Sequence, residues 1–134
     1  MDPERMPARY ARRLFRSCFL TAASVLAALW SAQYAFALVS SAVLASSVNY
    51  WRRPVYGWRR RIDIGTVAAG GAYQLYRAHD STRCAAYVAT CLFAAACYAM
   101  GRTSGNYNRS TAWHVGVHLC ANGGNIILYT AAEK

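Results

Sequence analysis

The sequence predicts an all-α fold, a polytopic bundle of four or five transmembrane helices. The stretch from Ser17 to Trp51 carries no formal charge, and arginines border it on both sides. Hydrophobic residues make up 56% of the chain and charged residues 15%, against about 25% charged in soluble domains. A surface helix of a soluble protein needs a polar face, whereas a bilayer needs about 20 apolar residues per helix. We therefore expect an integral membrane protein, in a membrane that the sequence does not identify.

The net charge of +10 comes from arginines placed at the ends of apolar segments. Topology determinants and contacts to anionic lipid headgroups are placed in this way. We therefore expect membrane lipids with anionic headgroups as partners, other membrane subunits as a second class, and no nucleic acid. The cysteines are odd in number and form no CxxC pair, which argues against a disulfide framework. We expect them to be small apolar residues that pack between helices. These are Cys18, Cys84, Cys91, Cys97 and Cys120.

The first apolar run is too long for one ordinary span. Residues 1–16 are basic, with the composition of an amphipathic helix that lies on a membrane surface. A single helix over 17–51 would measure about 50 Å, beyond a hydrocarbon core of about 30 Å. A hairpin that turns at residues 31–34 gives spans near 17–33 and 35–51. It places twelve of the 15 Arg and Lys residues on one side, so the positive-inside rule favours five spans; one long tilted helix is the alternative.

Three shorter spans follow, and we expect them near 63–77, 84–100 and 111–132. The connector from Gly101 to Ser110 is rich in turn-forming residues, which predicts a loop. Small residues at helical spacing predict close helix contacts in the first of these spans. They are Gly65, Ala69, Gly70 and Gly71. The chain is too short for a separate soluble domain, so residues 1–134 form a single membrane domain.

Polar side chains inside the spans are candidate functional residues, because they are costly in hydrocarbon. Four of them in the last span are spaced by four, four and three residues and share one helical face. They are His114, His118, Asn122 and Asn125. Two histidines one turn apart can bind one metal ion, as in helical zinc sites. The alternative is a polar seam that joins helices by hydrogen bonds and needs no ion.

A second polar group lies at one membrane face. Ser47 and Tyr50 end the first run, and one short connector joins them to Asp63. Two further crossings return the chain to this face, where the last span begins with His114 and His118. The topology therefore predicts that these five side chains lie at similar depth, where they could hold a zinc ion and a polarised water. Each also has a structural interpretation, Asp63 for example as a carboxylate at a helix N-terminus.

The order of these residues resembles the CREST superfamily of membrane hydrolases, which contains the alkaline ceramidases and the progestin and adipoQ receptors. The family carries Ser-x-x-x-His at the end of one helix, Asp at the start of the next, and His-x-x-x-His in the last. Here Ser47, Asp63 and the pair His114 and His118 stand in that order. The resemblance implies zinc held by His114 and His118, and a zinc site then needs Asp63 or another oxygen as its third ligand. This chain departs from the family at Trp51, which replaces the first histidine, and in having fewer than seven spans.

Two classes of function therefore compete. One is a CREST-like lipid amide hydrolase with zinc as cofactor, in which the resemblance implies that Ser47 and Asp63 are catalytic. The other is a non-catalytic membrane subunit or lipid-binding scaffold, in which Tyr50, Asn122 and Asn125 join the same residues in interhelical hydrogen bonds. A transport or pigment-holding role along the His/Asn seam is a third. The sequence leaves open whether the protein is an enzyme.

Overall fold

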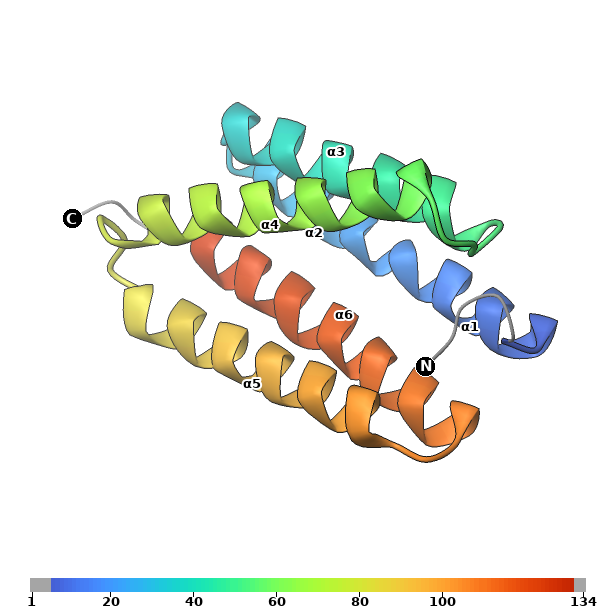
Figure 1. Ribbon diagram of the computed structural model, residues 1–134. Coiled ribbons are helices and arrows are strands. Elements are labelled where there is room, and N and C mark those ends of the chain that lie inside the picture. The colour runs from blue at the N-terminus through green and yellow to red at the C-terminus, as the bar shows by residue number, and fades with distance from the viewer. Residues whose placement is uncertain (1–5, 132–134) are drawn as a thin grey trace.

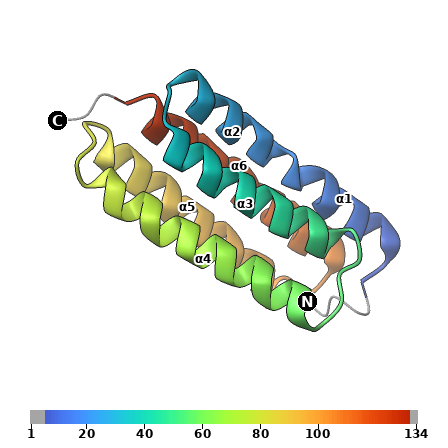
Figure 2. The same cartoon turned by 90° about the horizontal axis from the view of Figure 1, so that it is seen from above.

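A computed structural model describes residues 6–131, and within this range the fold is all-helical without a β-strand. The helices are α1 (Ala8–Cys18), α2 (Leu20–Trp30), α3 (Tyr34–Trp51), α4 (Trp58–Ala78), α5 (Cys84–Thr103) and α6 (Tyr107–Tyr129). The long helices lie side by side and alternate in direction (Figures 1 and 2). The all-α prediction is therefore confirmed.

Helices α1 and α2 form one nearly continuous element with a break at Phe19. The hydroxyl of Ser17 and the thiol of Cys18 both donate to the carbonyl of Leu14, at 2.8 and 3.3 Å. Such bonds to the preceding turn often bend a helix. Leu14 and Cys18 are fully buried, and α1 packs against α3 and α6. The basic N-terminal segment therefore joins the bundle from Ala8 onward instead of lying apart on a surface.

The chain turns back between α2 and α3, at the place where the hairpin interpretation puts the turn. Residues 31–33 form a tight connection, in which the amide of Gln33 donates to the carbonyl of Ala28 at 2.8 Å. Ala32 has a φ of 55°, a left-handed conformation that costs a residue with a Cβ about 1 kcal/mol. Residues 17–51 therefore form two antiparallel arms rather than one long helix.

Because Ala32 bears this backbone cost in an exposed turn, we expect Ala32→Gly to stabilise the protein by about 0.5–1 kcal/mol. Ala42→Gly, at an exposed position inside α3, is the matched control and should destabilise by about 1 kcal/mol. Unfolding in detergent, followed by circular dichroism, measures both changes. A loss of stability in both variants would contradict the left-handed turn.

The alternation of helices gives the bundle two chemically different ends. The start of α1, the α3–α4 connector and the α5–α6 connector lie together at one end (Figure 2). We call this the arginine-rich end. The described arginines in or beside it are Arg9, Arg12, Arg13, Arg16, Arg52, Arg53, Arg59, Arg60, Arg61, Arg102 and Arg109. Arg77 and Arg83 lie at the opposite end, so the charge asymmetry used to choose the hairpin is present in three dimensions.

The interior of the bundle holds about as many polar as apolar side chains, and many large apolar side chains lie on its surface. The most buried polar side chains include Ser24 and Thr111 at 0% exposure and Ser40 at 1%. Large apolar side chains face outward instead, for example Trp30 at 92%, Leu38 at 73% and Leu92 at 67%. Two helical stretches, Ala8–Trp30 and Cys84–Thr103, are long and apolar enough to cross a membrane.

Close helix contacts occur at some glycines and not at others. A Cβ on Gly70 would lie 3.1 Å from Val39 of α3, so the predicted close approach is present there. A Cβ on Gly65 or Gly71 would meet nothing within 4 Å. Between α5 and α6 the tight contact is at Gly124, whose Cβ would clash with the Thr90 hydroxyl. Helices α3 and α4, and α5 and α6, therefore pair closely, whereas α4 and α5 touch very little.

Candidate functional site

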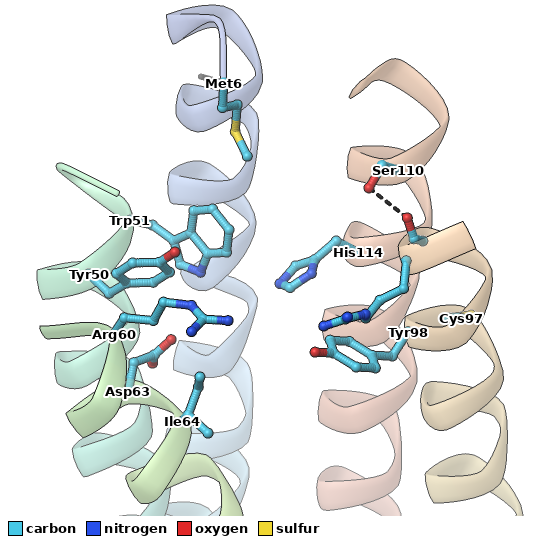
Figure 3. A pocket seen from close by; sticks show the side chains of 12 residues that line it. Met6, Tyr50, Trp51, Arg60, Asp63, Ile64, Cys97, Tyr98, Ser110 and His114 are labelled. Carbon is cyan, nitrogen blue, oxygen red and sulfur yellow. Dashed lines mark hydrogen bonds between the residues drawn. The ribbon is translucent and has the colours of Figure 1, made fainter. Parts of the chain in front are cut away.

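A cavity of about 150 Å³ lies at the arginine-rich end, between α3 and α4 on one side and α5 and α6 on the other (Figure 3). Its walls combine charged, aromatic and small residues from four helices and the segment before α1. They are Met6, Tyr50, Trp51, Arg60, Asp63, Ile64, Cys97, Tyr98, Gly101, Arg102, Ser110 and His114. Three of the side chains singled out in the sequence, Tyr50, Asp63 and His114, are among them.

Asp63 links α4 to α3. Its Oδ1 accepts hydrogen bonds from Ser47 Oγ at 2.6 Å and from Ser46 Oγ at 3.3 Å, and the side chain is 8% exposed. Both serines lie at the same oxygen of this carboxylate, and Asp63 also lines the cavity. The Ser46 hydroxyl also lies 3.0 Å from the carbonyl of Val43, so the short bond from Ser47 is the main one that stabilises this buried carboxylate. Ser47 and Asp63 therefore meet, as their short connector predicts.

The two histidines belong to a row of rings that reaches the cavity from α6. The ring of His114 lies 5.3 Å from that of His118 and 5.2 Å from that of Trp51, centre to centre. Trp51 in turn lies 4.7 Å from Tyr50. Figure 3 shows His114 pointing across the cavity toward Trp51. The tryptophan that stands at the family's histidine position is thus a direct neighbour of His114.

The predicted zinc ligands can be compared with the side chains that lie together in the structure. Within residues 6–131, no three His, Cys, Asp or Glu side chains come together as a group that could hold a metal ion. A protein zinc site takes at least three such ligands. His114 and His118 are neighbours, but Asp63 of α4, the third predicted ligand, is hydrogen-bonded to Ser46 and Ser47 of α3. Zinc therefore stays a prediction from the resemblance.

Asn122 and Asn125 lie farther along α6, away from the cavity. Asn122 accepts from Ser24 Oγ at 2.6 Å and donates to Thr21 Oγ1 at 3.3 Å, both on α2. It also donates to the carbonyl of His118 at 2.7 Å. Asn125 is 9% exposed. Asn122 therefore joins α6 to α2, which is the role of interhelical hydrogen-bonding residue that the sequence offered as an alternative.

A third polar group, which the sequence did not predict, joins four helices near the opposite end. Tyr129 of α6 shares a hydrogen bond with Ser40 of α3 at 2.8 Å and accepts from Gln74 of α4 at 2.5 Å. Gln74 accepts in turn from Tyr87 of α5 at 3.3 Å. Gln74, a polar amide inside a predicted span, could have indicated a polar group in the interior. The sequence does not show which tyrosines bond to it.

The chain matches no protein-family model, no curated protein and no solved structure. The CREST resemblance therefore rests on the order of Ser47, Asp63, His114 and His118 and stays a prediction.

Proposed function

We propose that this chain is a small multi-pass integral membrane protein without catalytic activity, a helical scaffold that binds anionic lipids at its arginine-rich end. The observation that carries this proposal is the distribution of polarity. A soluble protein buries most of its large apolar side chains, whereas here many of them are exposed, and hydroxyl and amide groups share the interior with two apolar clusters. That arrangement suits hydrocarbon, where polar groups must find partners inside the protein.

Helix length supports the same proposal. The arms of the bundle run from 18 residues in α3 to 23 residues in α6 and in the stretch Ala8–Trp30. These lengths correspond to about 27–35 Å at 1.5 Å per residue, close to a hydrocarbon core of about 30 Å. Length and composition identify only two of the five arms, because α3 carries four serines and an asparagine, and α4 and α6 carry arginines, histidines and asparagines.

Exposed aromatic residues mark both ends, as expected at membrane–water boundaries. Tyr56 and Trp58 are 53% and 61% exposed beside the arginine-rich end, where Arg60 and Arg59 lie over their rings at 5.4 and 5.5 Å. Trp30 and Tyr34 are 92% and 71% exposed at the other end. Arginines stacked on boundary aromatics hold their guanidinium groups at the level of lipid phosphates.

The interior polar groups favour a scaffold over a hydrolase. Ser47 donates its hydroxyl proton to Asp63, and Asn122 is bonded on both its oxygen and its nitrogen. No buried side-chain nitrogen or oxygen in the described part of the chain lacks a partner. These bonds join α3 to α4 and α6 to α2. The same residues therefore hold the helices together by hydrogen bonds within an apolar environment.

Membrane topology tests the proposal. Ala32→Cys and Val55→Cys place thiols in exposed connectors at opposite ends, and the parent chain gives the background from its native cysteines. In sealed vesicles we expect a membrane-impermeant maleimide to label one variant only, and to label both after detergent is added. Both variants should also stay with the membrane through alkaline carbonate. Labelling of both from the same side, or release by carbonate, would refute the spanning bundle.

A further inference from the structure

We propose that the cavity at the arginine-rich end is a binding site for a lipid phosphomonoester, a headgroup of the phosphatidate class. This inference rests on the proposed function, because it requires a bilayer around the bundle. It goes further by assigning one ligand class to one set of residues, namely Arg60, Arg102 and Asp63. The surface arginines alone would bind any anionic lipid.

The charges that line the cavity come from facing helices. Arg60 belongs to the first turn of α4 and Arg102 to the last turn of α5. Figure 3 shows Arg60 reaching into the space between the two halves of the bundle. Guanidinium groups are well suited to phosphate oxygens, which they bind through short charge-assisted hydrogen bonds. Both arginines stand at a helix end, the depth at which lipid phosphates lie.

Asp63 decides which phosphate fits. A carboxylate repels a phosphodiester, whose free oxygens only accept hydrogen bonds. A singly ionised phosphomonoester carries one P–OH group, which can donate to the Asp63 carboxylate while its two other free oxygens accept from Arg60 and Arg102. The two guanidinium charges then balance the carboxylate and the monoanion, so the filled cavity is neutral. A neutral, fully bonded group is what a partly dry site tolerates best.

The size and position of the cavity agree with a terminal phosphate on a lipid. About 150 Å³ accommodates a phosphate group but leaves little room for a bulky headgroup substituent. The cavity lies where α4 and α5 touch very little, with Ile64 and Tyr98 on its wall. Both of these side chains are about half exposed, at 52% and 49%. The ester oxygen and the acyl chains of the lipid can therefore leave the cavity between α4 and α5 toward the bilayer.

The test compares two lipids with identical chains on the full-length protein in detergent. Dioleoyl phosphatidate is the phosphomonoester, and dioleoyl phosphatidylglycerol is an anionic phosphodiester. The rise of the unfolding midpoint with lipid concentration gives each Kd. We expect about tenfold tighter binding of phosphatidate, because one charged hydrogen bond distinguishes the two lipids. We also expect Asp63→Asn to reduce that preference severalfold.

Two neighbouring arginines provide the matched comparison. Arg60→Gln should weaken phosphatidate binding about tenfold, whereas Arg61→Gln, exposed and outside the cavity, should change it less than twofold. Arg102→Gln repeats the test from α5 should Arg60→Gln lower the midpoint of the lipid-free protein. Equal losses from Arg60→Gln and Arg61→Gln, or equal binding of both lipids, would overturn the cavity site and leave the general lipid-binding scaffold intact.

Competition by soluble ligands shows whether the bound phosphate belongs to a lipid or to a soluble compound. Glycerol 3-phosphate and inorganic phosphate carry the same headgroup chemistry without acyl chains, and we expect them to compete at least a hundredfold more weakly than phosphatidate. Competition by either at the affinity of the lipid would overturn the assignment to a lipid. Absence of binding to both lipids, with stable insertion in vesicles, would refute the cavity site and the lipid-binding part of the proposed function together.

Discussion

Tyr129→Ala is expected to destabilise the protein by about 3 kcal/mol, a large loss for the truncation of one side chain. Tyr129 is 1% exposed, and its ring lies 4.5 Å from the ring of Phe36. Truncation would open a void among four helices and leave Gln74 and Ser40 without a shared partner. In a bilayer the transfer of apolar surface contributes little, so the loss comes from packing and from unpaired polar groups.

Two variants separate these contributions. Tyr129→Phe keeps the ring and removes only the hydroxyl, so about 1 kcal/mol should be lost, the range measured for hydrogen bonds between membrane helices. Tyr34→Ala, at a position 71% exposed, should change the free energy of unfolding by less than about 0.5 kcal/mol. Reversible unfolding in mixed micelles measures all three. Equal effects of Tyr34→Ala and Tyr129→Ala would contradict the burial of Tyr129 inside the bundle.

Most of the helix boundaries could be predicted, because charged and turn-forming residues mark them in the sequence. The turn at residues 31–33 lies where the sequence puts it, and the connection before α6 lies within the predicted loop but is shortened to residues 104–106. The beginnings of α1 and α4 were less predictable. The charge pattern predicts that the third span starts at residue 63, where the arginines stop, but α4 begins at Trp58. Arginine is a good helix former, and its long side chain can reach the membrane–water boundary. A helix can therefore continue through arginines that mark the end of its apolar span.

The candidate site could be predicted only in part, because helical spacing gives a face and not a neighbour. Ser47 and Asp63 meet because one short connector constrains them. His114 and Asn122 are eight residues apart, which turns their side chains about 80° relative to each other at 3.6 residues per turn. His114 consequently faces Trp51 and the cavity, whereas Asn122 faces α2. The polar side chains of α6 that the sequence placed on one face therefore contact two different neighbours.

The tyrosine network was not predictable for a different reason. Tyrosine has an apolar body and one polar atom, so it suits an interior, a lipid-facing surface and a boundary equally well. The chain has 10 tyrosines, and Tyr87 and Tyr129 are buried while Tyr76 is 74% exposed. Which tyrosines enter the interior depends on the rotation of each helix. That rotation is fixed by contacts such as the one between Gly124 and Thr90.

Gly124→Ala is expected to destabilise the protein by about 1–3 kcal/mol, because α5 and α6 approach closely at this glycine. The added Cβ would clash with Thr90 Oγ1 and lie 3.1 Å from Thr90 Cβ. Thr90 cannot turn away without cost, since its hydroxyl donates to the carbonyl of Tyr87 at 2.7 Å. Relief therefore requires the helices to separate, which also displaces Tyr87 from Gln74. The free energy of unfolding in mixed micelles measures the loss.

Gly123, the adjacent glycine, provides the control for Gly124→Ala. A Cβ on Gly123 would meet nothing within 4 Å, so Gly123→Ala should stabilise the protein by up to about 1 kcal/mol through its higher helix propensity. Neighbouring glycines are thus expected to respond with opposite signs. Thr90→Ala should restore part of the stability of Gly124→Ala, because it removes the clashing hydroxyl. If both alanines stabilised the protein equally, α5 and α6 would not be paired through Gly124.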